Sequence, residues 1–354
     1  MMMAPGPFGG AERVFAGGAA ALRALDRELD VWLLREVRAP QHCDDLIAQL
    51  PETITPVVID VEGRLDRAAL RALVSQIAAQ DVALIHTHGF KASIYTGLLR
   101  ALGRLGPCKF VATHHGVTSH SRIMRLYERA ERWALGRADS VVAVSPKMAD
   151  DLAAYGLDQA AITTIENMLA LAVPVASGQD WPADPLRLTF IGRLSHEKGC
   201  DLLLDAMARL DRAMPVRLDI LGDGEERAAL ENQAASLSLE DRVVFHGFVP
   251  DLASHLTGHA VIAPSRREGL PMAMIEAAAA GLPIIAARVG GLPRLVDEGR
   301  TGLLVEPQSA EALARAICDL AQCWPVLADG ARAHAETIRS AYAPSRWAEK
   351  TLAL

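Results

Sequence analysis

The chain has 354 residues, of which 51% are hydrophobic, 22% charged and only 5% aromatic. Because a domain usually takes about 100–200 residues, this length predicts two domains. The composition excludes disordered, collagen-like and mucin-like chains. No stretch reaches the roughly 18 apolar residues of a membrane-spanning helix. Met1–Gly10 lacks the basic and apolar regions of a secretory signal, so we expect a cytoplasmic protein.

The net charge of −7 argues against a nucleic-acid-binding chain. This total hides an uneven distribution, because residues 1–172 carry 18 basic and 19 acidic groups and residues 173–354 carry 18 and 24. Residues 91–147, the basic window, hold ten Lys or Arg against three Asp or Glu, which indicates an anionic partner. The five cysteines form no C-x-x-C pair, which argues against a disulfide framework or a zinc ribbon.

Short β-branched runs alternate with Ala- and Leu-rich helical segments, which predicts parallel sheets covered by helices on both faces. Strands of the first half are expected at Val31–Glu36, Val57–Asp60, Val82–His86, Phe110–Thr113, Ser140–Val144 and Ile162–Ile165. Strands of the second half are expected at Leu186–Ile191, Val216–Leu221, Val243–His246, Ala260–Ala263, Pro283–Ala287 and Leu303–Val305. A proline-rich linker at 171–185 separates domains 1–170 and 186–340, and a last helix follows at 341–354.

The start of the chain departs from this alternation. The helix predicted over Glu12–Leu25 follows Gly9 and Gly10, as it would after a strand-to-helix turn. The preceding MMMAPGPF contains Pro5 and Pro7 and makes a poor strand. We therefore expect the first parallel strand to be missing, through a truncated start or a replaced segment.

Two basic residues, Arg193 and Lys198, lie in a turn directly after the predicted strand Leu186–Ile191. The planar fork of an arginine and the compact charge of a lysine could together clamp a diphosphate. Taken alone, the motif favours the plainer interpretation, a turn with two solvated basic residues. The segment ILGDGEER at 220–227 misses the last glycine of the dinucleotide fingerprint, which makes a Rossmann oxidoreductase a weak hypothesis.

Two carboxylates, Glu268 and Glu276, flank the start of an Ala-rich helix that begins near Pro271. The amides of Gly269 and Leu270 at this start would point at an anion. A carboxylate among alanines needs hydrogen-bond donors, and the hydroxyls of a ribose would supply two. The alternative is a surface carboxylate on the wet face of the helix.

Histidines gather where two predicted strands of the first half end, at positions 86, 88, 114 and 115, with a further one at 120. Their spacing lacks the H-E-x-x-H pattern, and carboxylates and cysteines are absent nearby, so we expect no metal site. They are ordinary loop histidines, or one of them contacts a phosphate or a sugar hydroxyl.

Residues 121–136 have the periodicity of an amphipathic helix with a basic stripe formed by Arg122, Arg125, Arg129 and Arg132. A basic face of this kind can lie against anionic lipid, at about 1 kcal/mol per charge. A solvated face, partly neutralised by Glu128 and Glu131, is an equal alternative.

In their order and spacing these segments resemble glycosyltransferase family 4, the retaining nucleotide-sugar transferases of GT-B fold. The matching runs are GGAER at 9–13, HTHGFKA at 86–92, THHG at 113–116, ADSVVAVS at 138–145, FIGRLSHEKG at 190–199, ILGDGEER at 220–227, FHGFVPD at 245–251 and EGLPMAMIEAAAAGLPIIA at 268–286. The resemblance implies two Rossmann-like doubly wound domains facing across a cleft, the first for the acceptor and the second for the nucleotide sugar. The usual I-P-N-G reads Ile165-Glu-Asn-Met168, which leaves the role of Asn167 open.

The resemblance also implies residue roles. The donor diphosphate would be held by two cations and by backbone amides, the ribose by one carboxylate and the base by the loop after the third strand of the second domain. The implied catalytic residues are His115, Glu268, Arg193 and Lys198. The implied donor-binding residues are Gly10, Arg193, Lys198, Gly222, Phe248, Val249, Glu268, Gly269, Leu270 and Glu276. Acceptor or membrane contact would fall to His88, Lys91, Arg122, Arg125, Arg129 and Arg132.

The implied activity is transfer of a sugar from a UDP- or GDP-sugar to a lipid-linked or glycan acceptor, with retention of configuration and no obligatory cofactor. Such an enzyme would serve bacterial surface-polysaccharide or lipopolysaccharide assembly, in the cytoplasm or on the inner membrane face. Two alternatives remain at this stage. One is a degenerate nucleotide-binding scaffold without turnover, and the other is a transferase with a soluble small acceptor.

Overall fold

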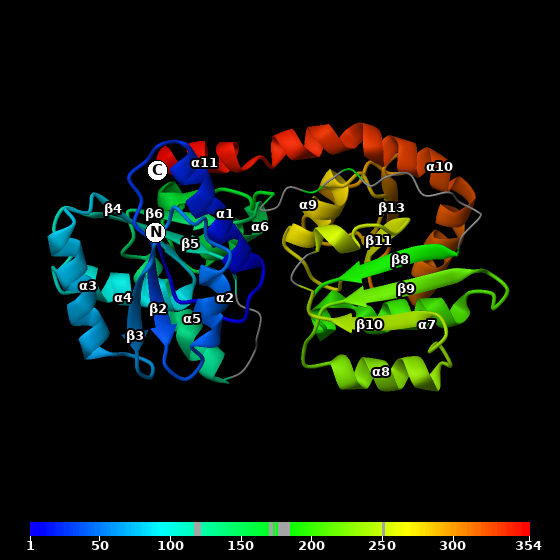
Figure 1. Cartoon of the computed structure of the whole chain (residues 1–354), viewed down its shortest axis with the longest axis horizontal. Helices are drawn as coiled ribbons and strands as arrows, with labels where there is room; N and C mark the ends of the chain where they lie inside the picture. The colour runs from blue at the N-terminus through cyan, green and yellow to red at the C-terminus, as the bar shows by residue number, and fades with distance from the viewer. Residues whose placement is uncertain (117–121, 170–172, 174, 176–184, 250–251) are drawn as a thin grey trace. The chain divides into compact units, whose positions relative to one another are not determined.

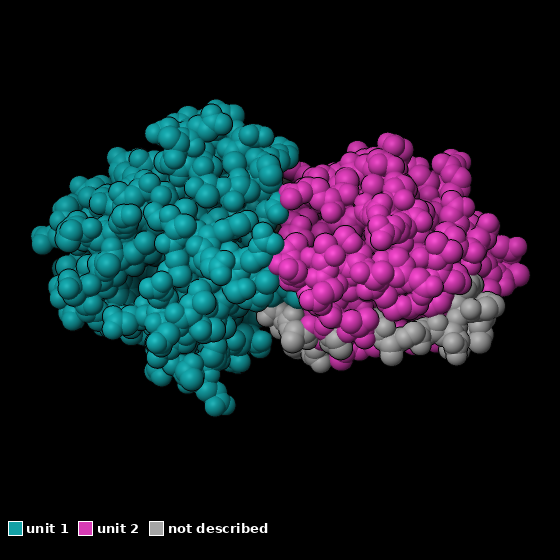
Figure 2. All heavy atoms as spheres, turned by 90° about the horizontal axis from the view of Figure 1, so that it is seen from above, with its two compact units in different colours: residues 1–170, 343–354 teal, residues 171–342 magenta. Residues whose placement is uncertain are grey.

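The computed structural model describes residues 1–116, 122–169, 173, 175, 185–249 and 252–354. The chain forms two compact units, the first built from residues 1–170 and 343–354 and the second from residues 171–342 (Figure 2). Among the described residues, no helix has both the length and the apolar character needed to span a membrane.

The first unit contains a seven-stranded parallel sheet in the order β3-β2-β1-β4-β5-β6-β7 (Figure 1). Its strands are β1 (Met2–Met3), β2 (Trp32–Glu36), β3 (Val57–Val61), β4 (Leu84–His88), β5 (Lys109–His114), β6 (Ser140–Ala143) and β7 (Ile162–Thr164). Its helices are α1 (Gly10–Ala24), α2 (Gln41–Ile47), α3 (Arg67–Ala79), α4 (Phe90–Ala101), α5 (Arg122–Leu135), α6 (Pro146–Ala154), the 3₁₀ helix η1 (Gln159–Ala161) and α11 (Pro344–Leu352). The parallel pairing confirms the predicted Rossmann-like class.

The expectation that the first strand is missing is wrong. Met2 and Met3 form β1 at the centre of the sheet and pair with β2 on one side and β4 on the other. Both side chains are almost fully buried. Pro5 and Pro7 come after the strand, in the loop that leads to α1, where they remove no hydrogen bond from the ladder. Two residues suffice because neighbouring strands hold both of their edges.

The second unit contains a six-stranded parallel sheet in the order β10-β9-β8-β11-β12-β13. Its strands are β8 (Leu186–Ile191), β9 (Val216–Leu221), β10 (Val243–Gly247), β11 (Ala260–Ala263), β12 (Ile284–Ala287) and β13 (Gly302–Val305). Its helices are α7 (Cys200–Arg209), α8 (Arg227–Ser236), α9 (Met272–Ala279) and α10 (Ala310–Ala341), with the 3₁₀ helices η2 (His196–Lys198), η3 (Ala253–His255) and η4 (Leu292–Arg294). This sheet is also Rossmann-like.

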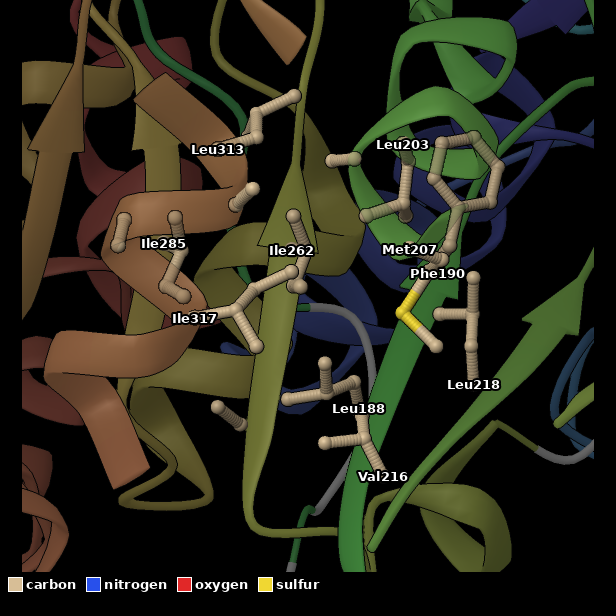
Figure 3. Close-up of a cluster of buried hydrophobic side chains, with 14 of the residues drawn as sticks. Leu188, Phe190, Leu203, Met207, Val216, Leu218, Ile262, Ile285, Leu313 and Ile317 are labelled. Carbon is tan, nitrogen blue, oxygen red and sulfur yellow. The ribbon is translucent and has the colours of Figure 1, made fainter. Parts of the chain in front are cut away.

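The core of the second unit lies between its sheet and the helices α7 and α10 (Figure 3). Phe190 of β8 and Ile262 of β11 meet Met207 of α7 and Ile317 of α10, and all four side chains are almost fully buried. Burial of each such side chain contributes roughly 1.5–3 kcal/mol. The core therefore fixes the two central strands whose carboxyl ends carry the candidate site.

The last two helices belong to different units. The long α10 packs on α7 and α9 of the second unit, whereas α11 packs on α1 of the first. Gly18 of α1 permits this second contact, because a Cβ at that position would lie 2.6 Å from the ring of Trp347. The end of the chain therefore supplies a large aromatic side chain to the first unit.

Candidate functional site

The strand order of the second sheet marks where a ligand is expected. Strands β8 and β11 are neighbours at its centre, but the chain continues from β8 to β9 on one side and from β11 to β12 on the other. Loops 192–199 and 264–271 leave the carboxyl ends of β8 and β11 at this topological switch point. In open α/β sheets, ligands bind in the crevice outside such a point.

The partly buried Arg266 joins the two loops. The guanidinium of Arg266 donates to both carboxylate oxygens of Asp201, at 2.7 and 2.6 Å, and its backbone amide donates to the carbonyl of Glu197 at 2.8 Å. Although burial alone would raise the pKa of Asp201, the hydrogen bonds and charge of Arg266 hold that pKa below its usual value. Bidentate pairs of this kind fix geometry as well as charge.

Lys198 and Glu268, one from each loop, form an ion pair between Nζ and Oε1. Only 25% of the lysine side chain and 11% of the glutamate side chain are exposed. The structure thus brings together two predicted site residues that are 70 positions apart in sequence. Arg193 lies exposed in the same loop as Lys198. A cation held beside a carboxylate can exchange that partner for the phosphate of a ligand.

Glycines let the backbones of neighbouring loops approach closely beside this ion pair, and we call these contacts the floor of the site. Gly222, after β9, has a φ of +145°, and a Cβ there would lie 1.9 Å from the carbonyl oxygen of Gly192. Gly290, after β12, has a φ of +55°, and its Cβ would lie 1.9 Å from the carbonyl oxygen of Glu268. Only glycine fits either position. The floor of the site is therefore made of backbone.

The helix α9 begins directly after this floor. Gly269 and Leu270 precede Pro271, the N-cap of α9, so their amides lie at the positive end of the helix dipole. Glu276 lies within α9 and is completely buried, which rules out the surface-carboxylate alternative. Its proposed contact with a ribose stays a prediction.

The remaining donor-side prediction concerns the end of β10. Phe248, which is 51% exposed, and Val249 directly follow this strand, at the same carboxyl edge of the second sheet. An exposed aromatic ring at a ligand-binding edge can stack on a nucleotide base. The positions of Phe248 and Val249 agree with a contact to the nucleotide base, which stays a prediction.

In the first sheet, histidines gather at the carboxyl ends of the neighbouring strands β4 and β5. His86 Nε2 lies 2.7 Å from Thr113 Oγ1, and His88 Nδ1 lies 3.1 Å from His115 Nε2. Burial lowers the pKa of His86 and of His115 to about 3, and that of His88 well below its ordinary value. These three imidazoles are therefore neutral at pH 7.

Aromatic rings from α1 and α11 enclose these histidines. Phe15 meets His88 edge-on with ring centroids 5.3 Å apart, and Trp347 is parallel to His86 with centroids 6.3 Å apart. Across the described parts of the chain, no group of three or more His, Cys, Asp or Glu side chains is arranged to hold a metal ion.

The loop before α1 is held by Glu12. Its Oε1 accepts from the amide of Gly6 and its Oε2 from the amide of Gly9, each at 3.1 Å. Burial raises the pKa of Glu12, and these hydrogen bonds oppose that rise. Gly10 is left exposed as the first residue of α1, where an amide can face an anion.

Lys91 does not lie where the sequence placed it. Its side chain is only 6% exposed, and Nζ donates to Glu36 Oε1 at 2.7 Å and to the Gly63 carbonyl at 3.2 Å. The long side chain reaches inward from the first turn of α4 and ties that helix to β2 and to the loop after β3. The expectation that it faces an acceptor or a membrane is therefore corrected, because its charge is already used inside the unit. His88, likewise proposed for acceptor contact, is fully buried.

Helix α5 presents a mixed basic and apolar surface. Arg125 and Arg129 are exposed, and they share this surface with Leu126 (58% exposed) and Trp133 (40%). The guanidinium of Arg132 lies 4.5 Å above the ring of Tyr155. The side chain of Arg122 is outside the described part of the chain, so its predicted place in the stripe is not assessed. The buried Glu131 anchors the opposite face of the helix, 3.1 Å from His114 Nδ1.

Two family models match the chain, one in each unit. The model described as "Glycosyltransferase Family 4" matches residues 8–172, and that described as "Glycosyl transferases group 1" matches residues 185–323. The chain belongs to glycosyltransferase family 4. Membership of this family, together with the two Rossmann-like units, identifies the fold as GT-B.

Relatives of this family-4 chain include glycosyltransferases from several organisms. The 2-deoxystreptamine glucosyltransferase of Streptomyces kanamyceticus is 32% identical over 59% of this chain and 58% of its own length. The putative colanic acid biosynthesis glycosyltransferase WcaL of Salmonella typhimurium is 27% identical over 74% of this chain and 67% of its own. These matches span between roughly half and two thirds of the relatives' length. The Anabaena protein HepE, solved in complex with UDP-glucose, shares the fold with a TM-score of 0.77 and 21% identity, covering 99% of this chain and 98% of that one.

The sequence did not reveal three contacts of this glycosyltransferase family 4 chain. Arg266 and Asp201 are 65 positions apart, and no local pattern pairs them. The His88–His115 contact joins the ends of neighbouring strands β4 and β5, which strand order alone could have suggested. Trp347 comes from the end of the chain, and the only feature of the sequence that pointed to its contact with the histidines was the predicted final helix.

Proposed function

We propose that this chain is a retaining glycosyltransferase that moves a sugar from a nucleoside diphosphate sugar to a lipid-linked or glycan acceptor. The observation that carries the proposal is the Lys198–Glu268 pair at the switch point of the second sheet, above a backbone floor and beside the start of α9. A site that combines a lysine with the backbone amides before a helix suits a diphosphate.

The proposed reaction breaks the bond between the anomeric carbon and the diphosphate oxygen. Negative charge then develops on the diphosphate, where Lys198, Arg193 and the amides of Gly269 and Leu270 would stabilise it. The acceptor hydroxyl oxygen bonds to the anomeric carbon on the same face, and its proton passes to the leaving phosphate. The family resemblance supports this retaining course, in which no protein carboxylate is needed as a nucleophile.

The comparisons support a choice of donors and acceptors to test first. HepE was solved with UDP and with UDP-glucose, so UDP-sugars come before GDP-sugars. WcaL is named for colanic acid biosynthesis, and a further neighbour of known structure is a lipopolysaccharide galactosyltransferase. We therefore propose a surface-polysaccharide or lipopolysaccharide intermediate as the acceptor.

The test is a panel of UDP- and GDP-sugars incubated with the full chain, with release of the nucleotide and the anomeric configuration of the product followed by NMR. The variant Lys198→Ala should lose roughly 100- to 1000-fold in kcat, as for other groups that stabilise a developing anion. Lys147→Ala is the matched control, because Lys147 pairs with Asp151 on the exposed surface of α6. Turnover that Lys198→Ala leaves intact, or an inverted product, would overturn the proposal.

The scaffold alternative makes a different prediction in the same panel. A degenerate protein would bind UDP or GDP but turn over no donor, and Lys198→Ala and Glu276→Ala would weaken that binding. A soluble acceptor would show itself through transfer to free sugars without any lipid. The intact pair of Lys198 and Glu268 favours an active enzyme.

We propose that α5 gives the enzyme a peripheral contact with anionic membranes. Exposed arginines interleaved with an exposed leucine and tryptophan are typical of helices that lie in the interface of a membrane. The double variant Arg125→Gln/Arg129→Gln should weaken binding to anionic vesicles roughly 30-fold, as measured by sedimentation, since each charge near the surface contributes about 1 kcal/mol. Arg300→Gln/Arg315→Gln removes the same charge from exposed positions of the second unit and should change sedimentation much less. Equal effects of the two double variants would contradict the contact.

A further inference from the structure

A chain of buried imidazoles crosses the carboxyl ends of β4 and β5. His86 Nε2 contacts Thr113 Oγ1 at 2.7 Å, and His88 Nδ1 contacts His115 Nε2 at 3.1 Å. The rings of His86 and His88 have centroids 4.5 Å apart. The two remaining nitrogens, His86 Nδ1 and His88 Nε2, are buried, and no described residue forms a hydrogen bond with them.

This pattern of contacts decides which nitrogen of each ring carries the proton. A neutral imidazole has one N–H donor and one acceptor nitrogen. A buried N–H without a partner is rarer and more costly than a buried acceptor without one. The proton of each ring therefore lies on the nitrogen that has a partner. His86 donates from Nε2 to Thr113, and His88 donates from Nδ1 to His115.

The tautomer of His115 follows from that of His88. Because Nε2 of His115 accepts the hydrogen bond, the single proton of its neutral ring lies on Nδ1. We propose that His88 is a positioning residue that fixes His115 as its Nδ1–H tautomer, so that His115 offers one N–H donor to an oxygen of the sugar donor. The last clause rests on the proposed function, whereas the assignment of the tautomer does not.

Aromatic side chains surround His88. His88 has no exposed surface, and Phe15 and Trp347 lie against the imidazoles from α1 and α11. Among the described residues, none offers an acceptor to His88 Nε2 that would favour the other tautomer. The groups that act electrostatically on these rings are the other imidazoles, His114 and the amino group of Met1, and none of them is a carboxylate that would favour imidazolium.

The assignment restricts the chemistry that His115 can perform. A neutral imidazole whose lone pair is engaged by His88 cannot remove a proton from an acceptor hydroxyl. Its Nδ1–H can only donate, and the oxygens that accept such a bond are a phosphate oxygen or a hydroxyl of the donor sugar. His115 is therefore not a general base, which agrees with the proposed transfer of the acceptor proton to the leaving phosphate.

The first test measures the tautomer directly in the substrate-free full chain. Protein labelled with ¹⁵N in its histidines is examined by long-range ¹H–¹⁵N correlation, which distinguishes the protonated ring nitrogen from the bare one. We expect Nδ1–H for His115 and for His88, and Nε2–H for His86. A wild-type spectrum in which His115 is protonated on Nε2, or on both nitrogens at pH 7, would overturn the proposal.

The second test compares two variants. His88→Asn keeps an amide near the place of Nδ1 that can donate to His115, whereas His88→Leu removes the donor. We expect kcat for sugar transfer to fall roughly 10- to 100-fold in His88→Leu and to recover in large part in His88→Asn. The KM for the nucleotide sugar should change by no more than about twofold. Equal losses in the two variants, or an unchanged His115 spectrum in His88→Leu, would contradict the proposal.

The two tests also separate this inference from the proposed function. The spectrum of the substrate-free wild type needs neither turnover nor a stable variant, so it decides the tautomer even if no donor is used. If sugar transfer occurs but His115 carries its proton on Nε2, the positioning role fails and the transferase stands.

Discussion

The carboxyl edges of the two sheets differ in chemistry although both sheets are Rossmann-like. The edge of the second sheet has charged side chains that are paired with each other, Lys198 with Glu268 and Arg266 with Asp201. The edge of the first sheet has His86, His88 and His115, whose low pKa values keep them neutral. The comparison shows that one fold accommodates paired charges beside the central strands of one sheet and neutral, hydrogen-bonded imidazoles at the ends of β4 and β5 in the other.

The physical origin of the difference is the partner available to each group. Burial disfavours a charge unless an opposite charge compensates it. At the second edge, Lys198 faces Glu268 from the neighbouring loop and Arg266 faces Asp201 in the first turn of α7, so each of these two partly buried cations has an opposite charge beside it. The imidazoles of the first edge face aromatic rings, a hydroxyl and each other, so they lose their protons.

The largest expected effect comes from breaking the link between the two loops of the second edge. Arg266→Gln leaves the partly buried Asp201 without its bidentate partner and should lower the free energy of unfolding by about 2 kcal/mol. Chemical denaturation measures this loss. Arg212→Gln is the matched control, because its pair with Asp241 is exposed and should contribute less than about 1 kcal/mol. Equal losses would show that the link is an ordinary surface pair.

The free energy of unfolding, measured over a series of pH values, tests whether His86 is neutral in the folded chain. Because the pKa of His86 is about 3 in the folded chain and about 6.5 when unfolded, the unfolded state binds the extra proton between these values. The free energy of unfolding should therefore fall as the pH drops below about 6.5, by up to about 1.4 kcal/mol per pH unit for this group. His86→Gln should reduce that slope. His196→Gln, at an exposed position, controls for the loss of a histidine. A slope that His86→Gln leaves unchanged would contradict a neutral His86.

A smaller effect concerns the exchange of partners at Lys198. If Glu268 competes with the diphosphate for Lys198, Glu268→Gln should bind UDP roughly fivefold more tightly, since a partly exposed ion pair contributes about 1 kcal/mol. Sugar transfer should fall in the same variant, because the proposed contact of Glu268 with the donor sugar is lost. Calorimetry and the donor panel measure the two quantities. Weaker UDP binding in Glu268→Gln would show that the carboxylate supports the nucleotide instead of competing with it.

The sequence predicted the regular parts of the fold well and the irregular part poorly. The longer strands, from β2 to β13, could be predicted because they are β-branched runs with turn residues between them. The strand β1 does not, because Met2 and Met3 owe their conformation to pairing with β2 and β4 and not to their own preference. The prolines that argued against a strand lie just beyond it.

The candidate site shows the same limit. The order of the motifs predicted a site in the second unit with Arg193, Lys198, Glu268 and Glu276. The burial of Glu276 in the structure excludes the alternative that it is a surface carboxylate. Sequence position could not show that Lys91 turns inward to Glu36, or that Arg266 meets Asp201, because both contacts join distant segments. The direction of a long side chain depends on neighbours that only the folded chain supplies.

The most direct test of the central claim is hydrogen–deuterium exchange of the full chain with and without UDP. We expect UDP to slow exchange mainly in residues 192–199 and 264–276, which form the two loops and the start of α9 where we propose that the diphosphate binds. Protection confined to the first unit, or absent from both of these segments at saturating UDP, would contradict it.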